Sequence, residues 1–130
     1  MIQSLFRASV GLGLAGMTLG IIMGIRQDFM LAPVHAHINL LGFVTLFLSA
    51  LYYRAVPEAA GLAIATFQAI AAIVGAIVFP IGIAGVLLGD HQRFMPLVVS
   101  GALIELAGMA LFALVIIRTS GGVTNPRSAP

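Results

Sequence analysis

Long apolar stretches alternate with short polar segments along this chain. Four stretches almost free of charge, roughly residues 5–25, 32–53, 61–88 and 94–117, each end at charged residues. A hydrocarbon core of about 30 Å requires about 20 consecutive apolar residues in a helix. None of the four alternates between apolar and polar residues as a membrane-spanning β-strand does. We therefore predict an all-α integral membrane protein, a four-helix bundle that forms one domain over residues 1–118.

Composition agrees with this prediction and narrows the chemistry. The chain is 61% apolar and only 8% charged, whereas soluble domains carry about 25% charged residues. It has no cysteine, which excludes disulfides, thiolate metal sites and cysteine nucleophiles. The basic residues are spread along the chain, so they predict no nucleic-acid surface. Any metal would have to be bound by histidine, carboxylate or methionine.

The arginines predict an orientation. With four spans, both termini and the middle loop share one side of the membrane. The arginines on that side are Arg7, Arg54, Arg118 and Arg127, and those on the other side are Arg26 and Arg93. The positive-inside rule then predicts cytoplasmic termini, in a bacterial inner membrane. A signal peptide is the alternative for the first stretch, which is long for one and lacks a clear cleavage site. We expect the polar tail, 119–130, to be disordered.

Small residues predict close helix packing. Gly16, Gly20 and Gly24 recur at steps of four in the first stretch, a spacing that lets another helix approach closely. We expect a homo-oligomer through this face, although the spacing does not say whether the neighbouring helix belongs to the same chain. In the third stretch, small and polar residues recur at steps of seven, and we expect the helix face that carries them to point into the bundle. That face holds Gln68, Gly75, Gly82 and Gly89.

The second stretch begins with two histidines, His35 and His37. At about 100° per residue they point to nearly opposite sides of a helix, so one rigid helix cannot present both to one metal. Polar and small residues share the side of His35, which we predict to face the interior. They are Asn39, Gly42, Ser49 and Tyr53. His37 lies above leucines and valine, and we expect it at the membrane interface, against a neighbouring subunit or bonded to a loop. The alternative is that both are merely interfacial histidines.

Haem is the metal cofactor that so few possible ligands could bind most easily. The chain contains three histidines, and porphyrin-bound iron needs only one or two axial ligands from the protein. Neutral imidazole suits iron. Gly42 follows His35 by seven residues and would leave backbone free of side chains beside a flat ring.

The string His35-Ala-His37-Ile-Asn39-Leu-Leu-Gly42-Phe43 resembles the histidine-bearing helix of subunit I of haem–copper oxidases, the cytochrome c oxidase superfamily. The resemblance covers about a dozen of the 130 residues. It implies a short four-span member in which His35 is an axial ligand of a low-spin haem b. The full-length catalytic subunits have further histidines for a second haem and for copper. This chain has no counterpart of them, so we do not expect an autonomous oxidase.

Two further residues are candidates for the site. His91, on the same side of the membrane as His35, is expected either as a second haem ligand or as an exposed loop residue. A second copy's His35, or an open coordination position for a gas, are alternatives. Glu105 lies about 16 Å into the fourth stretch, near the bilayer midplane, on a face shared with Gly101 and Gly108. We expect a proton carrier, a partner for cofactor or substrate, or a hydrogen bond to Gln68.

These features predict a small haem b-binding membrane protein that acts in electron transfer, gas sensing or as an accessory to a respiratory complex. Two alternatives remain open. One is a proton-coupled small-molecule transporter that uses Glu105, and the other is a cofactor-free assembly protein. Haem binding requires His35, and transport requires Glu105.

Overall fold

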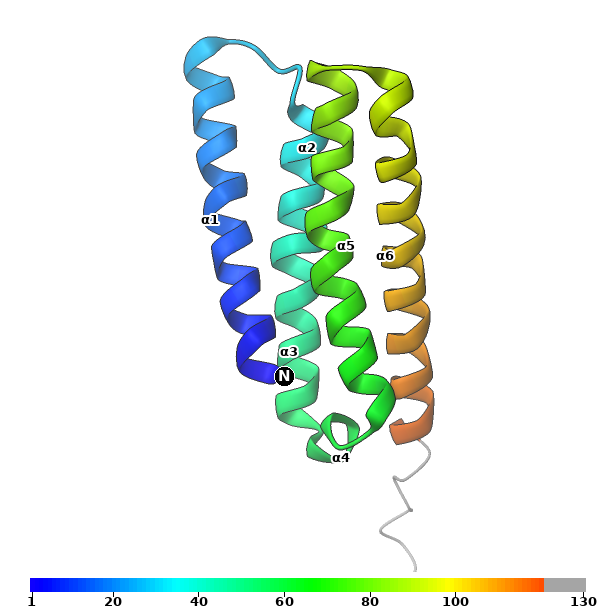
Figure 1. The fold of residues 1–130 in the computed structure, drawn as a ribbon. Coiled ribbons are helices and arrows are strands. Elements are labelled where there is room, and N and C mark those ends of the chain that lie inside the picture. The colour runs from blue at the N-terminus through cyan, green and yellow to red at the C-terminus, as the bar shows by residue number, and fades with distance from the viewer. Residues whose placement is uncertain (121–130) are drawn as a thin grey trace, which may run out of the picture.

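The computed structural model describes residues 1–120, and helices account for nearly all of them (Figure 1). In chain order the elements are α1 (Ile2–Arg26), α2 (Ala32–His37), the π-helix η1 (Ile38–Thr45), α3 (Leu46–Ala55), α4 (Pro57–Ala60), α5 (Ala63–Leu88) and α6 (His91–Ser120). The elements α2, η1 and α3 run on as one helix, so four helices within residues 1–120 are long and apolar enough to cross a membrane. The predicted all-α, four-span membrane bundle is confirmed.

The spans extend further than the apolar pattern predicted. The last one begins at His91, because the Asp90 carboxylate accepts the backbone N–H groups of Gln92 and Arg93 at 2.9 and 3.3 Å. Such a cap draws polar residues into the first turn of a helix. At the other end, Thr119 and Ser120 still belong to α6. The start of the predicted disordered tail is therefore wrong, and its remainder, 121–130, lies outside the described residues.

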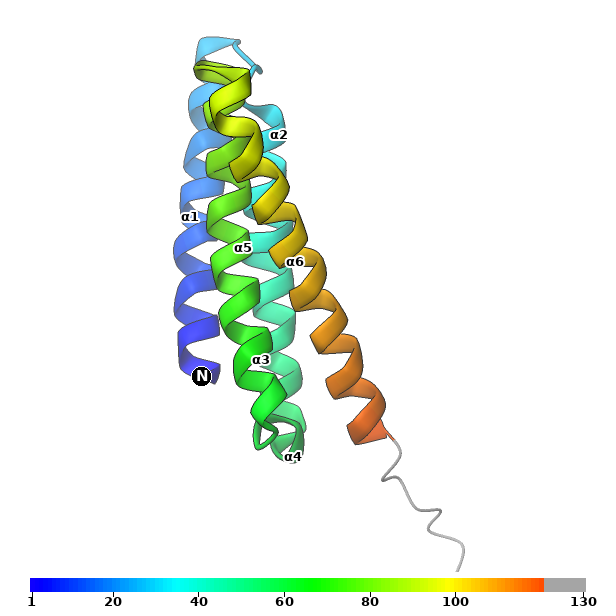
Figure 2. The same ribbon diagram turned by 45° about the vertical axis from the view of Figure 1, so that its right-hand side comes forward.

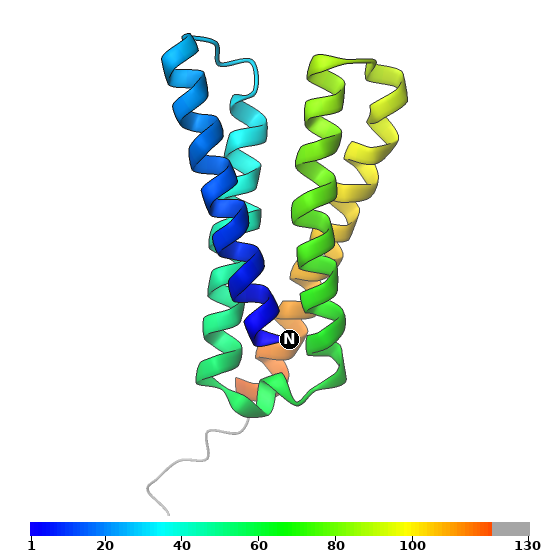
Figure 3. The ribbon, with the colours of Figure 1, turned by 60° about the vertical axis from the view of Figure 1, so that its left-hand side comes forward.

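The four spans form two helical hairpins (Figure 3). In one, α1 packs against the second span, and in the other α5 packs against α6. In Figure 3, α1 lies closest to α5 at the end that carries α4 and diverges from it toward the α1–α2 connection, where α2 still packs against α5 through the ring contact of His37 with Phe79. Helix α6 is inclined across α5, as Figure 2 shows. At the end that carries α4, Tyr52 and Tyr53 pack their rings against Phe112 at centroid distances of 5.4 and 5.9 Å.

Glycines bring α5 and α6 into backbone contact. A Cβ atom on Gly82 would lie 2.7 Å from the backbone nitrogen of Val98, and one on Gly101 would lie 2.6 Å from the Cα of Phe79. Packing of small residues against backbone is a main source of helix association in lipid. The inward face predicted for the third span is buried at Gln68, Gly75 and Gly82, whereas Gly89 follows the helix and is exposed.

The second span changes its helical pitch directly after the two histidines. The π-helix η1 begins at Ile38, and the hydroxyl of Thr45 donates to the carbonyl of Leu40, five residues earlier, at 2.9 Å. Segments of π-helix are rare and occur frequently at functional sites. A uniform 100° per residue did not predict this element.

Candidate functional site

His35 is held by the backbone of the neighbouring helix α1. Its Nδ1 atom lies 2.8 Å from the carbonyl oxygen of Gly16. A carbonyl can only accept, so Nδ1 carries the hydrogen and donates it. In the neutral ring, the lone pair is then on Nε2. A backbone carbonyl on one ring nitrogen is the usual arrangement that orients a metal-binding histidine and fixes its tautomer.

Asn39 braces the same turn of helix. Its Nδ2 atom donates to the backbone carbonyl of His35 at 2.8 Å. The same atom lies 3.3 Å from His35 Nδ1, but both nitrogens carry hydrogens once Nδ1 donates to Gly16, so this contact is no hydrogen bond. The amide therefore stabilises the backbone beneath the imidazole and leaves the tautomer to Gly16.

The small-residue face of α1 makes room for these two side chains. A Cβ atom on Gly16 would lie 2.6 Å from Asn39 Nδ2, and one on Gly20 would lie 2.6 Å from His35 Cε1. Gly24 has no atom within 4 Å of the corresponding position. Gly16 and Gly20 thus serve packing within one chain, and Gly24 alone is open to another molecule. The homo-oligomer stays a prediction.

The face predicted to point inward does so. Gly42, Ser49 and Tyr53 are buried, and His35 and Asn39 are half-buried. Gly42 admits α1, because a Cβ atom there would lie 2.9 Å from Cβ of Leu12. Its space is therefore occupied by the first helix.

His37 lies against the other hairpin. Its ring meets that of Phe79 edge-on, with 4.7 Å between the centroids, and its Nδ1 is 2.7 Å from the carbonyl oxygen of Pro33. An aromatic contact with α5 was not among the predicted placements, because the sequence pattern does not reveal which helix covers this side.

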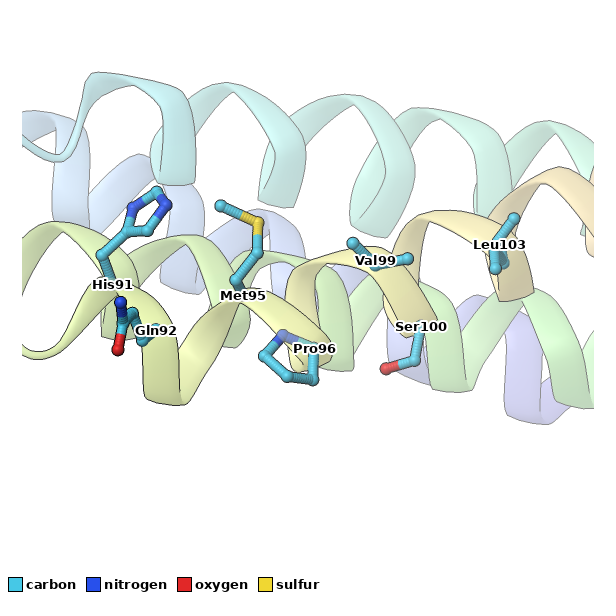
Figure 4. Close-up of a pocket in the computed structure, with 7 residues that line it drawn as sticks. All are labelled: His91, Gln92, Met95, Pro96, Val99, Ser100 and Leu103. Carbon is cyan, nitrogen blue, oxygen red and sulfur yellow. The ribbon is translucent and has the colours of Figure 1, made fainter.

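His91 is exposed at the start of α6 and belongs to a separate surface (Figure 4). It lines a shallow hollow with Met95, Val99 and Leu103, which extend to the same side of the helix. Every lining residue of this hollow belongs to α6, and none to α1 or α2, which hold His35. Within residues 1–120, no three histidine, cysteine or acidic side chains gather as a metal-binding group. The structure does not bring His91 to the His35 site.

Glu105 lies between α5 and α6, with its side chain against Gly75. A Cβ atom on Gly75 would lie 2.7 Å from Glu105 Cγ. The Oε1 atom of Glu105 is buried and has no hydrogen-bond partner among the residues that the structure describes. The predicted bond to Gln68 is wrong, because Gln68 Oε1 accepts the hydroxyl of Tyr53 at 2.9 Å instead.

One flank of the His35 site is poor in side-chain bulk. Ala32 and Ala36 lie on either side of His35 in the sequence and are exposed. A half-buried imidazole with its lone pair on Nε2 has the chemistry of an axial iron ligand, and a Cβ atom on Gly20 would lie 3.5 Å from that Nε2 atom.

Sequence analysis did not predict that the Gly16 carbonyl is the hydrogen-bond partner of His35. The glycine pattern of α1 was the sequence feature that could have indicated it. A small residue predicts a close approach, and a close approach exposes backbone carbonyls to a neighbour's donor. Pairing α1 with the second span required the tertiary structure. No protein-family model, curated protein or solved structure matches this chain.

Proposed function

We propose that this protein binds haem b in the membrane, with His35 as an axial ligand of the iron. The observation that carries the proposal is the 2.8 Å contact from His35 Nδ1 to the Gly16 carbonyl oxygen, which leaves Nε2 as the metal-binding atom. A haem would supply one-electron chemistry and, if one axial position stays open, a site for a small gas.

The chain's own residues have defined roles in this proposal. Gly16 holds the imidazole in one tautomer, which raises its basicity as a ligand. Gly20 leaves space for the ring, and Asn39 fixes the helical turn. The resemblance of this stretch to oxidase subunit I supports the same assignment of His35. We propose a role in electron transfer, gas sensing or as an accessory to a respiratory complex.

The test is an optical spectrum of the detergent-purified protein, oxidised and dithionite-reduced, after expression with a haem supply. We expect a Soret band that is lost in His35→Ala; sharp α and β bands on reduction would indicate a second axial ligand, and broad bands an open axial position. The matched controls are His37→Ala and His91→Ala, which should keep the bands. Absence of a Soret band in the wild type, or its survival in His35→Ala, would refute the assignment.

Gly20→Ala gives a second readout in the same experiment. A Cβ atom at that position would displace the His35 ring, so we expect shifted or weakened haem bands. Gly24→Ala, where the added atom meets open space, is the matched control.

Proton-coupled transport of a small molecule is the second candidate, because Glu105 Oε1 is buried without a partner. An unpaired carboxyl group at membrane depth is a usual position for a proton carrier. In proteoliposomes with an imposed pH gradient, Glu105→Gln should abolish proton-driven uptake, whereas His35→Ala should leave it unchanged. Equal uptake by wild type and Glu105→Gln would exclude this candidate.

We also propose a bacterial inner membrane with cytoplasmic termini. Because the chain has no cysteine, single cysteines report orientation without interference. A membrane-impermeant maleimide added to intact spheroplasts should label Gln27→Cys and not Ser4→Cys. The reverse pattern would invert the topology.

A further inference from the structure

Two hollows lie between α1 and α5, over the second span. The deeper hollow, which lies nearer the middle of the membrane, has a volume of about 160 Å³ and is lined only by apolar residues, among them Leu12, Ile38 and Pro80. The second, also about 160 Å³, is lined by Leu19 and Leu88 together with the charged residues Arg26 and Asp28.

Residue spacing places the two hollows one after the other along the line where α1 faces α5, which we call the seam. On α1, Leu12, Leu19 and Arg26 follow at steps of seven, which keeps them on nearly one face of the helix. Ile81 and Ala84 of the deeper hollow and Leu88 of the outer one likewise share a face of α5. Figure 3 shows α1 and α5 diverging toward the α1–α2 connection, where Arg26 lies.

The seam has the length of a lipid chain. From Leu12 to Arg26 the helix rises about 21 Å, somewhat more than the ~15 Å thickness of one hydrocarbon leaflet. A molecule with its headgroup at Arg26 would therefore reach the deeper hollow with an extended tail.

The outer hollow is lined by one basic and one acidic residue, Arg26 and Asp28. Arg26 is the last residue of α1, and Gln27 adopts the left-handed conformation with φ 51°. The turn is closed by the backbone N–H of Asp28, which donates to the carbonyl of Met23 at 3.2 Å. Asp28 Oδ1 accepts the backbone N–H of Met30 at 3.0 Å. Both charges thus line the same hollow in a defined loop.

We propose that this seam binds one phospholipid whose zwitterionic headgroup ends in a primary amine. The Arg26 guanidinium binds the phosphate, whose geometry it matches, and the Asp28 carboxylate accepts hydrogen bonds from the ammonium group. One acyl chain lies along the seam into the deeper hollow. A trimethylated headgroup has no N–H to donate, and an anionic headgroup would place uncompensated negative charge beside Asp28. The proposal is independent of haem binding, because neither hollow is lined by His35, Asn39 or Gly20.

The test is native mass spectrometry of the detergent-purified full chain with dioleoyl phosphatidylethanolamine, phosphatidylcholine or phosphatidylglycerol at equal concentrations. We expect the ethanolamine lipid to be retained roughly two- to fivefold better than the other two, the ratio for one charged contact at an exposed site. If the wild-type chain retains all three lipids equally, or retains the glycerol lipid best, that result alone overturns the proposal.

Variants separate the three parts of the site. Asp28→Asn should abolish the preference for ethanolamine over glycerol lipid, and Arg26→Gln should weaken retention of all three lipids. Ala84→Leu, which fills the deeper hollow, should weaken all three without changing their ratio. The matched control is Arg54→Gln, an arginine in the last turn of α3, which should behave as wild type. An unchanged preference in Asp28→Asn, or unchanged retention in Ala84→Leu, would count against the assigned contacts.

Discussion

The hydroxyl of Tyr53 donates a hydrogen bond to Gln68 Oε1 at 2.9 Å, and both side chains are buried. This bond joins α3 of one hairpin to α5 of the other, toward the end that carries α4. Polar bonds of this kind between membrane helices contribute about 0.6 kcal/mol on average and up to about 1.7 kcal/mol. The link is the polar part of a junction whose remainder is aromatic.

Removing the Tyr53 hydroxyl should therefore destabilise the bundle. We expect Tyr53→Phe to lower the free energy of unfolding by about 1 kcal/mol, since it leaves a buried amide oxygen of Gln68 unpaired. Unfolding by detergent titration, followed by circular dichroism, measures the change. In a double-mutant cycle with Gln68→Leu, additive losses would show that the two side chains do not interact.

Gly101 should tolerate no side chain. A Cβ atom there meets the backbone of Phe79 at 2.6 Å, and a backbone cannot move aside as a side chain does. We expect Gly101→Ala to cost about 1–3 kcal/mol, as overpacking does. Gly11→Ala is the control, because that position has open space and alanine favours helix by up to about 1 kcal/mol. Equal unfolding midpoints for the two variants would contradict the α5–α6 contact.

The two buried serines of the first hairpin should respond differently to alanine. Ser49 Oγ is buried without a partner, whereas Ser9 Oγ donates to the carbonyl of Phe6 at 2.8 Å. Because an unpaired buried polar group costs about 1–3 kcal/mol, Ser49→Ala should raise the free energy of unfolding by about 1 kcal/mol. Ser9→Ala should leave it unchanged or lower it. A loss of stability in Ser49→Ala would indicate a partner for this hydroxyl.

Glu105 gives a test of whether its carboxyl group serves stability. Since Oε1 has no partner, the isosteric variant Glu105→Gln should fold as well as wild type, within about 0.5 kcal/mol. Thermal unfolding in detergent measures this. A large loss would show that the carboxyl group takes part in a stabilising contact, and would weaken its assignment as a proton carrier.

Sequence patterns predicted which side of the second span is interior, but they did not predict what packs against it. The burial of Gly42, Ser49 and Tyr53 follows from their shared helical face. The role of Gly42 does not, because a glycine makes the same pattern whether a cofactor or another helix takes its space. Here Leu12 takes it.

Local sequence also did not predict the features that depend on which helices are neighbours. The π-helix η1 has no composition that distinguishes it from ordinary helix. The edge-on contact of His37 with Phe79 depends on which hairpin covers that side. The same is true of Gln68, whose partner is Tyr53 and not Glu105.

By itself the sequence determined the four membrane spans, their approximate bounds and their inward faces. The bilayer acts on each segment separately, since length and apolarity alone decide whether a helix satisfies its backbone in hydrocarbon. Only the tertiary structure decided that Gly16 holds His35, that Gly20 makes room for it, and that Glu105 Oε1 has no partner within residues 1–120. These contacts depend on the rotation and register of one helix against another, which short-range packing fixes only after the helices have paired.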